Sequence, residues 1–172
     1  MCIRDRRWVG WMVRHTSGYL CAPMTEERAD QLDLPLMWPA SQDPLRTRYT
    51  VAVDAAHGIT TGIDAVQRAR TARVLADPSS TPSDLVRPGH VLPLRARAGG
   101  VLERRGHTEA AVDLARLAGL EPVGLIGELV GDDGMCLRAD AIADLARTEG
   151  LALTTIDQLA QWRQAHDPGP AV

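Results

Sequence analysis

Apolar residues recur with the spacing of a helix in the second half of the 172-residue chain. Ala111, Leu114, Ala115 and Ala118 lie at positions i, i+3, i+4 and i+7, and Gly119 follows them. This spacing places four apolar side chains on one face of a helix, and a glycine is a common residue just after a helix end. The pattern predicts an amphipathic helix that closes at Gly119.

Three further helices are indicated by their first residues, Thr25, Asp140 and Thr155. A short polar side chain at such a position accepts a hydrogen bond from the first helical turn. Two glutamates follow Thr25 and favour the positive end of a helix, whereas Thr155 begins a capping box. We expect the first of these helices to stop before Pro35 and the second to end at Gly150.

Strand-like stretches lie among the helices. Residues 49–55 alternate in the manner of a half-buried strand, and residues 122–130 are almost continuously apolar, as in a strand covered on both faces. Residues 151–155 form a third such stretch. Helices and strands interleaved in this way predict an α/β layered domain.

Composition narrows the class of protein. The chain is 45% hydrophobic and 24% charged, as in an ordinary globular protein, and its net charge of −3 creates no positive field for nucleic acid. No apolar run has the length of a membrane span. The three cysteines, Cys2, Cys21 and Cys136, are odd in number and form no CxxC pair, so neither a disulfide framework nor a zinc site is expected. A reducing cytoplasm is the expected location.

Glu128 is the first candidate for chemistry, because it shares a strand face with the apolar residues Ile126 and Val130. A carboxylate on a buried face loses hydration, which favours a general acid or base near neutral pH. The alternative is a glutamate at a strand end that reaches solvent, since the turn "GDDG" follows directly. The strand pattern by itself leaves both interpretations open.

His90 and Cys21 are weaker candidates. Pro88 and Gly89 predict a turn that holds His90 in a defined place, and an imidazole exchanges protons readily near neutral pH. A single histidine on a turn is more often a surface residue. Cys21 ends a strand-like stretch and is interpreted first as a small core residue.

The turn "HGITTG" at residues 57–62 leads into a helix rich in arginine. The hydroxyls of Thr60 and Thr61, together with free N–H groups at the start of that helix, form a possible anion site. The commoner interpretation of the arginines is a solvated helix face.

The stretch "RRGHT" at residues 104–108 combines several polar groups at the start of the helix described first. Thr108 is expected to cap that helix, Arg104 and Arg105 offer charged hydrogen bonds of the kind that phosphate prefers, and His107 offers an imidazole to a cation. A basic surface loop is the alternative.

Taken together, four motifs closely resemble the 3,4-dihydroxy-2-butanone 4-phosphate synthase family of riboflavin biosynthesis. They are "RHTSG" from residue 14, "YTVAVDAAHGITTGI" from residue 49, "RPGHVLPLRARAGGVLERRGHTEAAVDLARLAGLEPVG" from residue 87 and "GELVGDDG" from residue 127. The resemblance covers about residues 12–163. It implies an α/β (α+β) layered fold with a mixed sheet flanked by helices, and a homodimer with sites near the subunit interface. It also implies a lyase that converts ribulose 5-phosphate to 3,4-dihydroxy-2-butanone 4-phosphate and formate with Mg²⁺ or Mn²⁺.

The resemblance also assigns roles to residues. It implies that His107 is a metal ligand and that His90 and Glu128 are essential to catalysis. The substrate-binding residues that it implies are Arg104, Arg105, Gly106, His107, Thr108 and Glu128. Further candidates for the site are Cys21, Thr60 and Thr61.

The chain departs from the family pattern at its amino-terminal end. Residues 1–11 are atypical, and the family's first strand and its acidic loop, which supplies a metal-binding glutamate, are not found ahead of "RHTSG". We therefore expect a synthase domain at residues 12–166 without these parts, and a flexible tail at residues 167–172. The alternatives are a catalytically inactive fragment that binds phosphosugars or dimerises, or a piece of a bifunctional fusion with GTP cyclohydrolase II.

Overall fold

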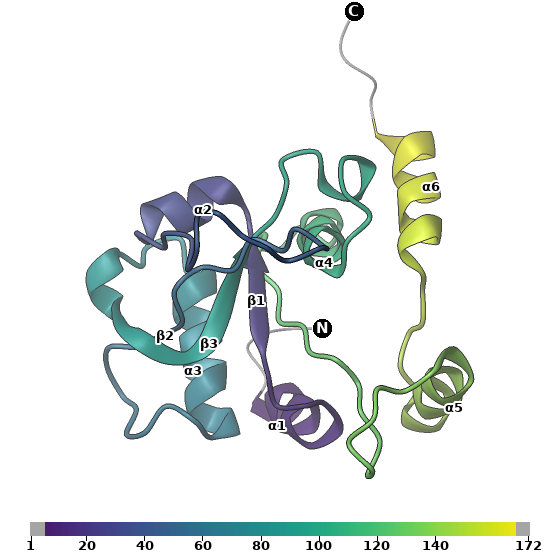
Figure 1. The fold of residues 1–172 in the computed structure, drawn as a ribbon, viewed down its shortest axis with the longest axis horizontal. Coiled ribbons are helices and arrows are strands. Elements are labelled where there is room, and N and C mark those ends of the chain that lie inside the picture. The colour runs from purple at the N-terminus through teal and green to yellow at the C-terminus, as the bar shows by residue number, and fades with distance from the viewer. Residues whose placement is uncertain (1–5, 168–172) are drawn as a thin grey trace, which may run out of the picture.

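A small mixed sheet lies at the centre of the computed structural model, which describes residues 6–167 (Figure 1). Its strands are β1 (Cys21–Met24), β2 (Val53–Ala55) and β3 (Leu85–Arg95), in the order β1-β3-β2. β1 runs parallel to β3, whereas β2 runs antiparallel to it. Helices flank this sheet, so the predicted layered α/β fold with a mixed sheet is confirmed.

Two of the predicted strands are shorter or more irregular than expected. Residues 122–130 lie beside β1 but form isolated bridges, such as Cys21 with Ile126, rather than a continuous strand. Pro23 has no N–H to return the hydrogen bond that Gly124 donates to its carbonyl oxygen, so the ladder is interrupted there. The stretch 49–55 is regular only in β2, because Pro93 likewise accepts from Thr50 and cannot donate.

The predicted strand at residues 151–155 is wrong. This stretch is irregular and mostly exposed, and within residues 6–167 no strand pairs with it. A strand without a neighbour has no hydrogen-bond partners for its backbone groups except water, and the mostly exposed apolar residues of this stretch bury too little surface to stabilise it.

The main core forms between the sheet and two helices that pack on each other, α1 (Arg6–His15) and α3 (Ala65–Ala76). Val9 and Met12 of α1 and Ala69 and Leu75 of α3 are buried in it. Completely buried side chains of this kind each contribute on the order of 1–3 kcal/mol to folding. The core therefore supports the strand ends where the polar motifs lie.

Helix α2 (Glu26–Gln31) begins as the sequence predicts, because the Thr25 side chain accepts a hydrogen bond from the Arg28 N–H at 3.1 Å. It also ends before Pro35, as expected. Helix α4 (His107–Leu117) differs at its first residue. Its N-cap is Gly106 and not Thr108, which is buried in the first turn.

The remaining helices lie beside the sheet and the helices already described. Helices α5 (Ala139–Glu149) and α6 (Ile156–His166) stand to one side of the sheet in Figure 1, and α6 packs on α4 and on the short helix η2 (Gly100–Leu102). The capping box at Thr155 is confirmed, whereas α5 has Arg138 as its N-cap, ahead of the predicted Asp140. A second short helix, η1 (Pro82–Asp84), precedes β3.

In the described part of the chain no helix has the length and apolar character needed to cross a membrane. Residues 1–5 of the atypical amino-terminal stretch and residues 168–172 of the predicted tail lie outside the described residues.

Candidate functional site

His90 lies within β3, and the turn predicted at Pro88 and Gly89 takes the form of a bulge in that strand. The pairing with β2 passes from Val91 opposite Val53 to Val86 opposite Asp54, so that residues 87–90 have no partners in β2. Gly89 fits there because any side chain would overlap the Val53 backbone. The bulge holds His90 against β2 rather than on a surface turn.

The partner of His90 is Asp54, a residue that the sequence analysis did not identify. The His90 ring Nδ1 lies 2.6 Å from Asp54 Oδ2, and the His90 backbone N–H donates to Asp54 Oδ1 at 3.0 Å. The Asp54 side chain is 5% exposed and the His90 side chain 40% exposed. An aspartate at the end of the apolar stretch "YTVAVDA" was the available signal, because a buried carboxylate needs a partner.

Arg68 of α3 adds a positive charge next to this pair. The residue is buried, and its Nη1 donates to the Gly18 carbonyl oxygen at 2.7 Å. Burial lowers the pKa of the Arg68 guanidinium, and the neighbouring carboxylates of Asp54 and Asp64 oppose that shift. This charge lies inside the protein, so it does not belong to the solvated arginine face that was the commoner interpretation of the helix.

Polar groups of the "GITTG" turn are bound by Gln67 of α3. Gln67 Oε1 accepts from the N–H groups of Thr60 and Gly62, each at 2.7 Å. Asp64 caps α3 by accepting from the Gln67 N–H at 2.9 Å, and this hydrogen bond lowers the pKa of the Asp64 carboxyl. Thr60 and Thr61 are exposed and remain predicted site residues.

Glu128 is exposed, so of the two interpretations the solvent-reaching carboxylate describes this structure. Its backbone carbonyl oxygen accepts from the Ser17 N–H at 3.2 Å. The loop that follows α1 continues from Ser17 to Gly18, which is held by Arg68, and to Leu20, whose carbonyl oxygen accepts from β3. One loop thus connects the Glu128 segment with the strand that carries His90.

The "RRGHT" stretch has its two arginines engaged differently. Arg104 Nη1 lies 2.5 Å from Glu109 Oε2, and Arg104 Nη2 donates to the Leu45 carbonyl oxygen at 2.7 Å. Glu109 is 1% exposed and also accepts from the Arg97 N–H at 3.0 Å. Arg105 pairs with Asp157 at 2.6 Å on the surface. Arg104 is therefore half-buried and held by these partners, while Arg105 is exposed.

The start of α4 presents groups suited to an anion. Among residues 6–167 no side chain caps the N-terminal N–H groups, and Gly106 at the N-cap has no room for a side chain, which would overlap Arg104 Nη1. Uncapped N–H groups and the helix dipole favour negative charge. His107 is exposed in the first turn.

A divalent metal requires more ligands than His107. Between residues 6 and 167, no group of three or more His, Cys, Asp and Glu side chains is arranged to hold a metal ion. In the same range, no hydrogen bond or ion pair joins His107 to Glu128 or His90. The described residues therefore do not by themselves form a metal site.

Cys21 is buried in β1, as its interpretation as a core residue predicts. Burial raises the pKa of its thiol to about 11, so the thiol is protonated near neutral pH. The rings of Tyr19 and Tyr49 lie 6.4 Å apart near this thiol, and burial raises the pKa of both phenols.

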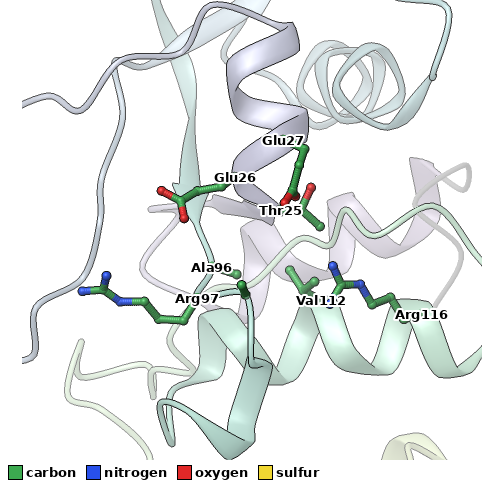
Figure 2. Close-up of a pocket in the computed structure, with 8 residues that line it drawn as sticks. Thr25, Glu26, Glu27, Ala96, Arg97, Val112 and Arg116 are labelled. Carbon is green, nitrogen blue, oxygen red and sulfur yellow. The ribbon is translucent and has the colours of Figure 1, made fainter. Parts of the chain in front are cut away.

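Two hollows of the surface lie away from the predicted catalytic residues. Figure 2 shows the smaller one, about 10 Å³, between Thr25 and Glu27 at the start of α2 and Val112 and Arg116 of α4. This volume holds about one water molecule. The larger one, about 340 Å³, is lined by residues 36–41, 46–49 and 97. Neither is lined by His90, His107 or Glu128, which are exposed.

Comparison with known proteins identifies the family. A family model described as 3,4-dihydroxy-2-butanone 4-phosphate synthase matches residues 4–162. The riboflavin biosynthesis protein RibBA of Salinispora arenicola is 56% identical over 156 residues, which are 91% of this chain but 37% of that protein. The chain therefore spans less than two fifths of the length of this curated relative.

Solved structures of 3,4-dihydroxy-2-butanone 4-phosphate synthases are also similar to this chain. A 3,4-dihydroxy-2-butanone 4-phosphate synthase of Candida albicans is 46% identical, with a TM-score of 0.87 over 94% of this chain and 81% of that one. Another synthase, in complex with two magnesium ions, is 45% identical, with a TM-score of 0.89 over 95% of this chain and 83% of that one. The chain belongs to the 3,4-dihydroxy-2-butanone 4-phosphate synthase family.

Proposed function

We propose that this protein is a 3,4-dihydroxy-2-butanone 4-phosphate synthase, a lyase that converts ribulose 5-phosphate to 3,4-dihydroxy-2-butanone 4-phosphate and formate. The observation that carries the proposal is the family match across residues 4–162, which includes all four polar motifs. The connection of Glu128 to the His90 strand through one loop supports it.

The reaction needs groups that move protons at a sugar carbon chain. A proton leaves the carbon beside the ketose carbonyl to form an enediol, water is lost, and the carbon skeleton rearranges. Water then returns as one carbon departs as formate, so the atoms of a five-carbon sugar phosphate are divided between the two products. Glu128, an exposed carboxylate, serves as the general base in this proposal. His90 first takes up a proton at Nε2 and then donates it to the hydroxyl that leaves as water.

We propose the start of α4 as the phosphate site. The uncapped N–H groups there, with Arg105, provide hydrogen-bond donors and positive charge. Arg104 has a supporting part, because Glu109 and the Leu45 carbonyl oxygen hold its guanidinium. Gly106 and Thr108 set the shape of this turn. Binding at a distance from the reacting carbons positions them for the proton transfers.

Mg²⁺ or Mn²⁺ is the proposed cofactor, with His107 as one ligand. A divalent ion stabilises the charge of an enediolate as a Lewis acid. Hard cations prefer several oxygen ligands, which the described residues do not gather around His107. A homodimer with sites near the subunit interface, and a cytoplasmic location, complete the proposal.

The direct test is release of formate. Purified protein is incubated with ribulose 5-phosphate and Mg²⁺, and formate is measured with formate dehydrogenase. We expect turnover, and we expect Glu128→Gln to reduce kcat at least about 100-fold because the amide cannot accept the proton. Glu121→Gln is the matched control, since Glu121 is an exposed glutamate of the same segment. Absence of formate, or equal rates in the two variants, would contradict the proposal.

A further inference from the structure

Four separate stretches of sequence meet around the His90 ring and its partner Asp54. The Asp54 carboxylate and the Gly62 backbone lie against the ring, and Arg68, bound to the Gly18 carbonyl oxygen, lies close to Asp54. We propose that Asp54 is a positioning residue that fixes the tautomer of His90, with the proton on Nδ1 and Nε2 left available to the substrate. The catalytic consequence depends on the proposed function, whereas the tautomer itself does not.

The hydrogen-bond geometry assigns the proton. A carboxylate has only acceptor sites, so the 2.6 Å contact between Asp54 Oδ2 and His90 Nδ1 requires that Nδ1 be the donor. The other oxygen, Oδ1, accepts from the His90 backbone N–H at 3.0 Å. With both oxygens bound to the same residue, the carboxylate cannot rotate away without losing two hydrogen bonds.

The carboxylate in turn is fixed by its surroundings. Asp54 is buried, and a buried carboxylate is costly without positive charge nearby. Arg68 supplies that charge and is itself anchored on the Gly18 carbonyl oxygen. In the described part of the chain Arg68 Nε has no hydrogen-bond partner, and the attraction to Asp54 and Asp64 opposes the cost of burying this guanidinium.

Gly62 covers the contact between the ring and the carboxylate. Its φ of +86° is a conformation that other residues rarely adopt. A methyl group at this position would overlap Asp54 Oδ2 and lie 2.8 Å from His90 Nδ1. The "GITTG" turn therefore closes over the Nδ1 side of the ring, while 40% of the His90 side chain remains exposed.

A single substitution distinguishes a role of Asp54 in fixing the His90 tautomer from a role in stabilising the fold alone. In Asp54→Asn the side chain keeps one acceptor oxygen and gains an NH₂ donor, so it cannot accept from both the His90 N–H and Nδ1. The amide then donates to Nδ1 and shifts the neutral ring to the Nε2–H tautomer. Asp113→Asn is the matched control, because Asp113 is equally buried and paired with an arginine, Arg163, that does not contact His90.

The experiment is ¹⁵N–¹H NMR of the imidazole rings in the full chain at about pH 9, above the ordinary imidazole pKa. His90→Gln identifies the His90 signals. We expect a protonated Nδ1 in the wild type and in Asp113→Asn, and a protonated Nε2 in Asp54→Asn. A wild-type ring protonated at Nε2 overturns the proposal even if the asparagine variant does not fold, as does an asparagine variant whose ring is unchanged.

Steady-state kinetics of the Asp54 variants are the second test. In a protein that releases formate we expect Asp54→Asn to lower kcat about 100-fold or more with little change in KM, and Asp54→Glu to recover part of the loss. Unchanged kcat in Asp54→Asn overturns the catalytic part. If the wild type releases no formate, the proposed function fails, while the NMR result still decides the tautomer.

Discussion

Asp54 and Glu109 are two buried carboxylates with similar partners and different consequences. Each accepts a backbone N–H and lies close to an arginine. The remaining oxygen of Asp54 is bound to an imidazole, whereas that of Glu109 is bound to Arg104 and so connects the residue 45 loop to α4. A buried carboxylate can therefore orient a reactive group when its second oxygen binds an imidazole, or hold a loop when that oxygen binds an arginine.

The largest expected effect is that of Gly62→Ala, which disturbs the Asp54 region. The positive φ and the overlap with Asp54 Oδ2 together are expected to lower the free energy of unfolding by about 3 kcal/mol and to displace the His90 ring. Urea unfolding measures the stability. Gly134→Ala, which has a similar φ of +78° but open space around it, is the control and is expected to lose only about 1 kcal/mol. Equal losses in both variants would mean that the close approach to Asp54 is unimportant.

Glu109→Ala is expected to have an intermediate effect in the other region. It removes two hydrogen-bond acceptors and leaves Arg104 without its carboxylate, for a loss of about 2 kcal/mol, since the Arg104 side chain is 23% exposed and keeps some hydration. Chemical denaturation tests this, with the exposed Glu149→Ala expected to change stability by less than about 0.5 kcal/mol. If Glu109→Ala also changed the tautomer of His90, then Glu109 as well as Asp54 would orient that ring, and the distinction between the two carboxylates would be wrong.

Arg105→Met is expected to have the smallest effect on stability. The ion pair with Asp157 is exposed and contributes less than about 1 kcal/mol. If Arg105 contacts phosphate as proposed, KM for ribulose 5-phosphate rises about 10-fold through loss of a charged hydrogen bond. Arg104→Met is the comparison: it should destabilise the protein more than Arg105→Met does. The opposite order of stability would show that Glu109 does not hold the loop through Arg104.

The sequence predicted the helix caps at Thr25 and Thr155 correctly, because a cap depends on local residues, whereas the caps predicted at Thr108 and Asp140 each lie two residues past the observed ones. The side chains of Thr25 and Thr155 each accept a hydrogen bond from a backbone N–H three residues later, a contact that needs no tertiary structure. His90, Glu128 and His107 were identified by residue type within motifs, and their roles remain predictions.

The partners of those residues were not predicted, because they come from distant parts of the chain. Asp54 is 36 residues from His90, and Arg104 is 59 residues from the Leu45 carbonyl oxygen that it binds. Pro23 and Pro93 interrupted strands that apolar patterning predicted as continuous, since periodicity counts side chains and not N–H groups. For Glu128 the strand pattern left two interpretations open, and the structure, in which this side chain is exposed, distinguishes them.

The bulge at residues 87–90 has a consequence for how the protein meets its substrate. It is fixed at both ends, by Val86 opposite Asp54 and by Val91 opposite Val53, and Leu92 beyond it is held by the parallel strand. The imidazole and its carboxylate are therefore assembled before any ligand arrives, and binding energy is not consumed in bringing them together. Adjustment on binding is left to exposed groups such as Arg105 and His107, whose side chains have the freedom to move.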